Sequence, residues 1–344
     1  MKEKIGFIAV GQAGGNIGKL LKTNGFDVVF LNSSKGDLDT LNIDEDKKYH
    51  ISEGLGCAKD RKVAKQVAKN DFKNINEFIQ KGLNDKELYY ILFSSGGGTG
   101  SGISPTLAKI YAQALNKNVG IITILPSDKD TLQAQINSYE CMKELVEIED
   151  LCGFFILDNA SNNNTEHINK NFVNLFTKIF EYKKYETSKG NIDESEILKL
   201  LKTRGMLNIA TCKNDETTKK LIENINNNIF AKPEKDGKIK YLGLSKGINF
   251  EENLFKSEVG KYLDKFENVN KDYTLAILSG LTMPFKRIKS INEKITAEKE
   301  TIINLSKITE TKLESISFLD EIEQTANKKV QENMTADEIL ANLF

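Results

Sequence analysis

Five glycines fall within seven residues in the stretch Gly96-Gly97-Gly98-Thr99-Gly100-Ser101-Gly102, and this stretch decides how the chain folds. It lies between the apolar run Leu88–Phe93 and the helix-like run Ile103–Leu115. A strand that ends in a glycine-rich turn and continues into a helix directs several backbone N–H groups, and the positive end of the helix dipole, at one place. Side chains in the turn would block the approach of an anion to the backbone, which is why glycine is favoured there. The stretch predicts a phosphate-binding loop rather than a flexible linker, because linkers do not join a buried strand directly to an amphipathic helix.

Strands and helices alternate on both sides of this loop, which is typical of a parallel sheet covered by helices on both faces. The predicted strands of the first half are Lys4–Val10, Asp27–Asn32, Leu88–Ser94, Val119–Leu125 and Gly153–Asp158. The predicted helices are Gly14–Thr23, Arg61–Asn70, Ile75–Lys81, Ile103–Leu115 and Leu132–Ile148. Residues 1–165 are therefore expected to form one α/β domain with a doubly wound parallel sheet.

A smaller α/β domain is expected to follow. Residues 166–190 contain a helix, Glu166–Tyr185, with one apolar face. Residues 191–288 then alternate between predicted helices at Glu194–Thr203, Asp215–Asn226 and Asn249–Phe266 and predicted strands at Met206–Thr211, Ile239–Ser245 and Tyr273–Leu278. Residues 289–344 begin as a long helix. We expect it to pack lengthwise on the body rather than to form a free coiled coil, because its apolar positions do not keep a strict heptad.

The composition is that of a soluble globular protein. Of the 344 residues, 39% are hydrophobic and 28% charged, and the formal net charge of -1 argues against direct binding to nucleic acid. The four cysteines lack CxxC spacing and are expected to be buried thiols, and the 2 histidines do not suffice for a histidine-rich metal site. No apolar run approaches the roughly 18 residues of a membrane span, and the N-terminus has no leader-like segment. We expect a cytoplasmic protein without membrane contact.

A second glycine loop, Val10-Gly11-Gln12-Ala13-Gly14-Gly15-Asn16-Ile17-Gly18, also follows a predicted strand and begins a helix. Taken alone, it resembles the dinucleotide-binding motif of oxidoreductases. That site expects an acidic residue at the end of the second strand to hold the ribose, and Asn32 stands there instead. An oxidoreductase would also leave the loop at 96–102 without a role. The sequence contains no GxxxxGK[ST] pattern of a P-loop.

The motif GGGTGSG at 96–102 resembles the signature of the tubulin/FtsZ superfamily of GTP-driven filament proteins, and further landmarks follow in the family's order. The resemblance extends over roughly residues 1–290. It implies two α/β domains joined by a central helix, binding of GTP and GDP with Mg²⁺, and head-to-tail assembly of identical subunits.

The resemblance implies which residues hold the phosphates. In the first loop they are Gly11, Gln12, Gly14, Gly15 and Asn16, and in the second Gly96, Gly97, Gly98, Thr99, Gly100, Ser101 and Gly102. Asn16 either reaches the base or ribose or caps its helix. Between the two loops, Glu53–Arg61 resembles the segment that senses the γ-phosphate, with Gly54, Gly56 and Ala58 as the matching residues. Lys59 or Arg61 either supplies positive charge to the phosphates or is a solvated surface residue.

A sugar and base site is also implied. Asp130, with Asp128 as the alternative, lies where the family places its ribose-binding loop, and Asn32 is counted among the nucleotide-binding residues. The pair Asp158-Asn159 resembles the tubulin segment in which the asparagine reads the guanine edge, because an amide offers both a donor and an acceptor. On the central helix the matching amide is Asn169, preceded by Thr165, or in a register shifted by two residues Asn171, preceded by His167.

The segment Asn191-Ile192-Asp193-Glu194-Ser195-Glu196 resembles the FtsZ loop in which two acidic residues lie next to an asparagine. The resemblance implies that Asp193 and Glu196 are a catalytic pair, with Asn191 beside them, and that they complete the nucleotide site of the next subunit. Their i, i+3 spacing at a helix start puts both carboxylates on one side, from which they can polarise a water for attack on the γ-phosphate. The alternative is structural: Asp193 caps the helix and Glu196 completes a capping box.

The FtsZ-like acidic pair and the tubulin-like Asp158-Asn159, combined in a small single chain, most resemble the TubZ branch, the segregation tubulins of plasmids and phages. That resemblance implies a dynamic filament that moves DNA through a DNA-bound adaptor protein. The alternatives are an FtsZ-like division or phage-positioning filament, a nucleotide-binding scaffold without hydrolysis and, remotely, the dinucleotide-dependent oxidoreductase. The segment Thr335–Phe344 begins with a Thr-x-x-Glu capping box and predicts a short amphipathic helix that docks on its own subunit, on the next subunit or on an adaptor.

Overall fold

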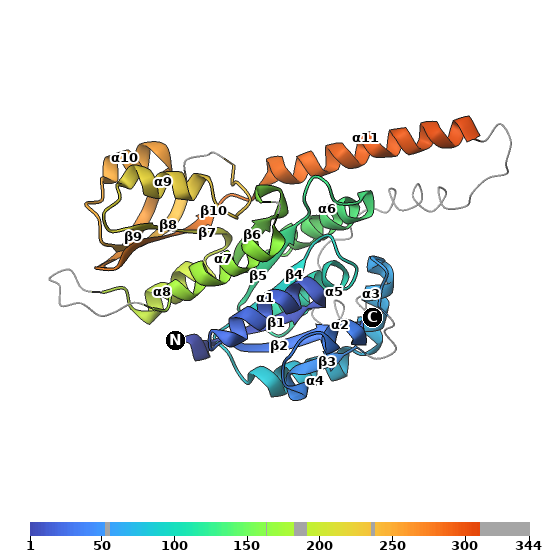
Figure 1. Cartoon of the computed structure of the whole chain (residues 1–344). Coiled ribbons are helices and arrows are strands. Elements are labelled where there is room, and N and C mark those ends of the chain that lie inside the picture. The colour runs from blue at the N-terminus through green and yellow to red at the C-terminus, as the bar shows by residue number, and fades with distance from the viewer. Residues whose placement is uncertain (52–55, 163, 182–190, 235–237, 310–344) are drawn as a thin grey trace.

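The computed structural model describes residues 1–51, 56–162, 164–181, 191–234 and 238–309. In these residues, ten strands form one mixed sheet with the order β3-β2-β1-β4-β5-β6-β7-β10-β8-β9 (Figure 1). The strands are β1 (Ile5–Val10), β2 (Asp27–Asn32), β3 (Lys48–His50), β4 (Leu88–Ser94), β5 (Val119–Leu125), β6 (Gly153–Asp158), β7 (Gly205–Lys213), β8 (Lys238–Lys246), β9 (Lys261–Val269) and β10 (Tyr273–Leu281). The α-helices are α1 (Gly11–Thr23), α2 (Lys35–Asp39), α3 (Arg61–Asn70), α4 (Phe72–Leu83), α5 (Thr99–Lys109), α6 (Leu132–Val146), α7 (Thr165–Lys178), α8 (Glu194–Lys202), α9 (Thr218–Asn226), α10 (Glu252–Glu258) and α11 (Phe285–Thr309).

The strands β1 to β6 are parallel and build the first half of the sheet. Strands β1, β5 and β6 are buried along their whole length, as expected when helices cover both faces. The predicted bounds of β2, β4, β5 and β6 are confirmed, and β1 begins at Ile5 instead of Lys4. The sequence did not predict β3 or α2, since elements of three and five residues are too short to show a period.

Aromatic side chains fill the face of the sheet under α1, α7 and α8. The ring of Phe176 on α7 lies 5.7 Å from that of Phe7 on β1 and 5.6 Å from that of Phe155 on β6, both centroid to centroid and edge to face. On the other face, apolar residues of α4, α5 and α6 pack against the same strands. Packing on both faces thus fixes the strands, and it also fixes the positions at which the loops after these strands begin.

The second half of the sheet joins the first through a short seam between β6 and β7. The paired residues are Gly153 with Gly205 and Phe154 with Met206. A Cβ atom at Gly153 would lie 2.7 Å from the carbonyl oxygen of Leu201, so only glycine lets α8 pack this closely on the seam. Beyond it, β10 runs antiparallel between β7 and β8, and β9 pairs in parallel with β8 at the edge.

The predicted helix Asn249–Phe266 is wrong. A helix occupies only Glu252–Glu258, and the chain then turns at Gly260 (φ 148°) into the edge strand β9. No residue other than glycine adopts that backbone conformation easily, so the turn ends the helix. Strand β9 has polar residues on both sides and Leu263 at 75% exposure, which conceals the strand pattern. This segment forms a strand because it pairs with β8. The spacing of apolar residues within the segment does not predict that pairing.

Helix α11 begins directly after β10 and lies along α6, as Figure 1 shows. Its apolar residues Ile291 and Ile295 are buried, which confirms packing on the body for this part of the predicted long helix. The predicted helix Glu166–Tyr185 is too long, because α7 ends at Lys178 and residues 179–181 are not helical. The segment Thr335–Phe344 lies outside the described residues. Within the described ranges, no helix combines the length and the apolar character needed to cross a membrane.

Candidate nucleotide-binding site

A cavity of about 560 Å³ lies at the carboxyl ends of β1, β4, β5 and β6. This is the edge of a parallel sheet at which loops and helix N-termini converge on one place. The cavity is lined by Val10, Gly11, Gln12, Ala13, Asn16, Ser34, Asp37, Gly56, Cys57, Ala58, Lys59, Ser94, Gly96, Gly97, Gly98, Thr99, Gly100, Pro126, Asp130, Ala134 and Asn159.

Two helices begin at the cavity without a side-chain cap. Helix α1 follows Val10 and α5 follows Gly98, and among the described residues neither helix has a side chain that accepts from its first turn. Helices α2, α3, α6, α7 and α8 are capped by Ser34, Asp60, Thr131, Asn164 and Asp193, whereas α4, α9 and α10 also lack a side-chain cap but contribute no residue to the cavity lining. The first-turn N–H groups of α1 and α5 are therefore available for an anion, and both helix dipoles favour one there.

The structure brings most of the predicted phosphate-binding residues to this cavity. Both glycine loops line it, through Gly11, Gln12, Asn16, Gly96, Gly97, Gly98, Thr99 and Gly100. At Gly97 an added Cβ atom would have Ser94 O, 3.9 Å away, as its nearest neighbour in the described chain, which leaves the space in front of this residue open. At Gly11, φ is +72°, a conformation that favours glycine.

Other predicted residues support the cavity from behind. A Cβ atom at Gly14 would lie 2.2 Å from Leu92 O on β4, so this glycine lets α1 approach the sheet. A Cβ atom at Gly15 would lie 3.0 Å from the side chain of Leu41, which follows α2. A Cβ atom at Gly102 would meet Ala64 on α3 at 2.7 Å. The hydroxyl of Ser101 donates to Gly97 O and so bends the loop back on its helix. The predicted residue Gly54 lies outside the described residues.

Asp130 and Asn159, which also line the cavity, follow β5 and β6. One carboxylate oxygen of Asp130 accepts hydrogen bonds from the backbone N–H (2.7 Å) and the hydroxyl (2.9 Å) of Ser127. Asn32 is buried and donates to Asp37 over 3.2 Å, so it shapes the wall behind the lining. Asn169 is half-buried on α7 and is not part of the lining, and the same holds for Asn171.

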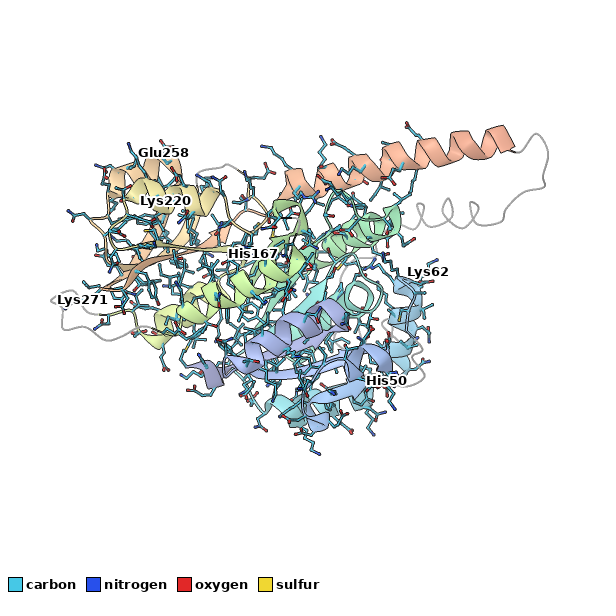
Figure 2. All side chains as sticks on the ribbon, in the orientation of Figure 1. His50, Lys62, His167, Lys220, Glu258 and Lys271 are labelled. Atoms are coloured by element: carbon cyan, nitrogen blue, oxygen red, sulfur yellow. The ribbon has the colours of Figure 1, made fainter. Side chains whose placement is uncertain are left out.

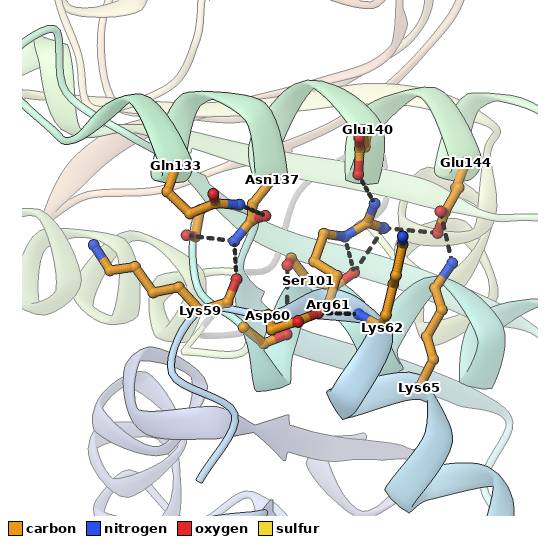
Figure 3. A network of polar contacts seen from close by, with 12 residues as sticks. Lys59, Asp60, Arg61, Lys62, Lys65, Ser101, Gln133, Asn137, Glu140 and Glu144 are labelled. Carbon is orange, nitrogen blue, oxygen red and sulfur yellow. Dashed lines mark hydrogen bonds and ion pairs between the residues drawn. The ribbon is translucent and has the colours of Figure 1, made fainter. Parts of the chain in front are cut away.

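The loop 56–60 closes the cavity above the second glycine loop. Ala58 (φ 43°) and Lys59 (φ 65°) adopt left-handed conformations without being glycine. The amide of Asn137 on α6 donates to Lys59 O over 2.8 Å and to Gly97 O over 3.1 Å, which joins the two loops (Figure 3). The ammonium group of Lys59 donates to Thr131 Oγ1 over 3.2 Å, so its charge stays at the cavity rim.

Arg61 fits neither of its two predicted roles. Its side chain is 7% exposed, so it is not a solvated surface residue, and it is not part of the cavity lining. Its guanidinium group donates to Glu140 Oε2 and Glu144 Oε2 on α6, both over 2.8 Å, and to Ser101 O (Figure 3). Burial lowers the pKa of Arg61, but the two carboxylates outweigh this effect and raise it. Arg61 thus fastens α3 to α5 and α6 behind the phosphate loops.

Ser34, Asp37 and Cys57 are among the cavity residues that sequence reasoning missed. Ser34 caps the short helix α2, on which Asp37 lies. The signal was the polar pair Ser33-Ser34 directly after a buried strand. Cys57 contacts Ser33 Oγ over 3.1 Å, and all four cysteines are free and buried, as expected. Across the described ranges no group of three metal-ligating side chains occurs, and the two histidines, His50 and His167, lie on separate elements (Figure 2).

The acidic pair lies away from the cavity. Within the described chain, no residue of 191–196 belongs to the lining. Asp193 Oδ1 accepts from the backbone N–H of Glu196, and Glu196 Oε2 accepts from that of Asp193, each over 2.9 Å. The capping box is therefore present in the structure. It leaves both side chains at the surface, at the end of the molecule where the first strand begins (Figure 1).

Comparison with known proteins agrees with this geometry. The model of the Tubulin/FtsZ family, GTPase domain, matches residues 4–165. The tubulin-like protein TubZ of a Clostridium botulinum C phage is 28% identical over 98% of this chain and 96% of its own length. The crystal structure of Clostridium botulinum phage c-st TubZ superposes with a TM-score of 0.79 at 26% identity, and covers 88% of this chain and 100% of that one. The GTPγS-form protofilament of TubZ from Bacillus thuringiensis serovar israelensis has the same fold, with a TM-score of 0.72 at 17% identity over 89% and 94% of the two chains.

Proposed function

We propose, from the match of the Tubulin/FtsZ family GTPase domain to residues 4–165, that the protein is a TubZ-like filament GTPase. Its subunits join head to tail and hydrolyse GTP where two subunits meet. The cavity binds the nucleotide, and the Asn191–Glu196 loop of the next subunit completes the active site. The crystal structure of TubZ from Bacillus thuringiensis serovar israelensis contains a protofilament, which supports assembly of this kind.

This proposal rests on the positions of the cavity and of the acidic loop Asn191–Glu196, which lie at opposite ends of β1. Val10 and Gly11 line the cavity at the end of β1. At the other end, Glu194 forms ion pairs with Lys4 Nζ (3.1 Å) and with the N-terminal ammonium group (3.5 Å), both of which precede β1. A strand of six residues spans about 20 Å at a rise of about 3.3 Å per residue. The acidic loop therefore reaches a nucleotide only in another subunit.

Binding follows from the geometry of the cavity. The open helix starts of α1 and α5 receive the phosphates, and loop 56–60 closes over them with the Lys59 ammonium group at the rim. Asn159 offers its amide to the guanine edge, and Asp130 lies where the ribose hydroxyls fit. The central-helix amide Asn169 remains a candidate for a second base contact once the nucleotide is in place.

Hydrolysis is assigned to the acidic pair. The oxygen of a water molecule bonds to the γ-phosphorus while the bond to the β–γ bridging oxygen breaks, and GDP and phosphate result. One carboxylate of the pair orients the water and takes its proton, with Asn191 beside it. The Ser195 hydroxyl and the Glu196 backbone N–H lower the pKa of Asp193, so this carboxylate is ionised at neutral pH. In the free subunit both carboxylates are engaged in the capping box, so assembly has to turn one of them toward the neighbour.

Mg²⁺ accompanies the nucleotide in this proposal. Besides Asp130, which is assigned to the ribose, the cavity contributes one carboxylate, Asp37, and Mg²⁺ in nucleotide sites is held by one or two carboxylates together with phosphates and waters. The donor set therefore fits an ion that enters with the triphosphate. When bound, the ion neutralises negative charge on the phosphates.

We assign the filament to the cytoplasm and to the segregation of plasmid or phage DNA. Four free thiols suit a reducing compartment, and the similar TubZ comes from a phage. With a formal net charge of -1, the chain lacks the basic excess for direct DNA binding, so a DNA-bound adaptor protein provides the link.

The test is the GTPase rate per subunit as a function of protein concentration, with light scattering recorded in parallel at fixed Mg²⁺ and salt. We expect a rate near zero below a threshold concentration and a steep rise together with scattering above it. ATP serves as the control nucleotide and should support neither. A rate per subunit that does not depend on concentration would contradict the shared site, and equal assembly with ATP would contradict the assignment of the guanine pocket.

A further inference from the structure

Arg287, at the start of α11, reaches the base end of the cavity from outside the residues matched by the family model. Its side chain is 14% exposed and that of Asp158 is 10% exposed. Arg287 Nε donates to Asp158 Oδ2 over 2.8 Å, and Nη2 donates to Asp158 Oδ1 over 3.2 Å. This is the two-point arrangement of guanidinium and carboxylate, which fixes direction as well as distance.

The same guanidinium group also holds the neighbouring loop. Nη2 donates to Pro126 O over 2.7 Å, and Nη1 lies 3.3 Å from Asp128 Oδ1. Pro126 lines the cavity, and the loop it begins runs to Asp130, which lines it as well. A single side chain thus joins the loop after β5 to the loop after β6.

Both loops depend on this contact for their shape. Asp158 Oδ1 also accepts from the backbone N–H of Ala160 (3.0 Å), and Asp158 O accepts from Ser161 Oγ (2.7 Å), which folds the turn that presents Asn159 to the cavity. On the other loop, Lys294 of α11 pairs with Asp128 and thereby lowers the pKa of that carboxyl. Helix α11 therefore anchors both of these segments, each of which contributes residues to the cavity lining.

We propose that Arg287 is a positioning residue of the nucleotide site, which sets the spacing of the loops 126–130 and 158–161 so that Asn159 and Asp130 meet the guanine base and the ribose. This inference rests on the proposed function, since it takes the ligand to be a guanine nucleotide. Arg287 acts through Asp158 and Pro126 and not by touching the ligand. It also makes the fit of the base dependent on the position of α11.

The test uses the full chain with Arg287→Ala, Arg287→Lys and the control Lys286→Ala. Lys286 is 82% exposed and pairs with Glu234 instead of a cavity loop. Binding of GTP, ITP, ATP and inorganic triphosphate is measured by calorimetry with Mg²⁺. For Arg287→Ala we expect at least a tenfold loss of GTP affinity and a loss of preference for GTP over ITP and ATP, whereas affinity for triphosphate changes less than twofold. Lys286→Ala should match the wild type.

If the Arg287→Ala variant fails to fold, Arg287→Lys tests whether Arg287 is a positioning residue. Lysine can pair with Asp158 but cannot hold Asp158 and Pro126 O in the same planar arrangement, so its preference for GTP over ITP should fall at least threefold. An unchanged preference in either variant, or an equal loss of GTP and triphosphate affinity, would overturn the inference. A wild-type protein that shows no preference for guanine would instead overturn the proposed function.

Discussion

The ammonium group of Lys4 and the carboxylate of Glu194 lie 3.1 Å apart. This ion pair fastens the first turn of α8 to the amino-terminal end of β1. Glu87 contacts the same ammonium group over 3.1 Å. These contacts raise the pKa of Lys4 and lower that of Glu194, so both groups stay charged at neutral pH. The acidic loop is therefore presented at a fixed place on the face opposite to the cavity.

Glu196→Gln separates the catalytic role of this residue from its capping role. Glutamine completes a capping box as well as glutamate does, so α8 and the stability of the subunit should be retained. The charge that orients water is lost, so we expect normal GTP binding, assembly, and GTP turnover reduced at least tenfold, with filaments that persist in light scattering. Mixing a small fraction of this variant into the wild type should slow turnover beyond its proportion.

Glu196→Ala and Glu194→Gln are the matched controls. The alanine variant loses both the charge and the cap, so its turnover should fall and its thermal midpoint should decrease as well. Glu194→Gln removes the pairing with Lys4 but leaves the acidic pair intact, and should hydrolyse GTP at a rate within about threefold of the wild type. Wild-type turnover in Glu196→Gln would show that the segment is only a helix start.

Asn137→Ala should loosen the two phosphate loops together. Removal of the amide takes this donor away from Lys59 O and leaves Gly97 O with the Ser101 hydroxyl, for which we expect a loss of about 1–3 kcal/mol in unfolding free energy and weaker GTP binding. Asn137→Asp should be worse, because it places a charge against carbonyl oxygens. Gln133→Ala removes only the neighbour that donates to Asn137 Oδ1 and should have a smaller effect in urea denaturation and calorimetry.

Gly97→Ala and Gly98→Ala should behave differently although the residues are adjacent. At Gly98 the new Cβ atom would lie 2.8 Å from the Cα atom of Lys59, so loop 56–60 has to move, and both unfolding free energy and GTP affinity should fall. At Gly97 the Cβ atom meets no atom of the described residues closer than 3.9 Å, so stability without nucleotide should hold while GTP affinity falls. Urea denaturation without nucleotide, followed by titration with GTP, measures both quantities. Equal effects of the two changes would contradict the phosphate position.

The corner between α10 and β9 should weaken in acid. Hydrogen bonds from Lys256 and Lys265 lower the pKa of Glu252 from 4.5 to about 2. Because the folded value lies below the unfolded one, the contribution to stability is complete above about pH 4.5 and is lost as the pH falls toward 2. Glu252 is 41% exposed, so Glu252→Gln should cost less than about 1 kcal/mol at pH 6. In denaturant titrations the gap between wild type and variant should close by pH 2.

The sequence was most informative where strands are buried on both faces. Asp27–Asn32, Leu88–Ser94 and Gly153–Asp158 are apolar runs with clear ends, and their bounds were predicted correctly. Strand β9 was missed because an exposed edge strand has no continuous apolar run, and its partner β8 lies in a separate segment. The helix predicted at Asn249–Phe266 was thus wrong because pairing with a distant strand determines the structure there. The periodicity of apolar residues in the segment carries no information on such pairing.

At the candidate site, the sequence predicted the two glycine loops, which contribute to the cavity through their backbone groups. Glycine loops after strands have a strong local pattern, and both loops line the cavity. The side-chain supports were not predictable in this way. Arg287 and Asp158 are 129 residues apart, and Arg61 and Glu140 are 79 residues apart, so only the fold brings each pair together. A local pattern also cannot tell a catalytic pair from a capping box, and the structure contains the capping box at Asp193 and Glu196.

Loop 56–60 holds Ala58 and Lys59 in left-handed backbone conformations. Each of these conformations costs a residue other than glycine about 1–3 kcal/mol. The hydrogen bond from the Asn137 amide to Lys59 O helps to hold the backbone in this conformation. The loop beside the second glycine loop therefore stores backbone strain, which its contacts with α6 have to offset.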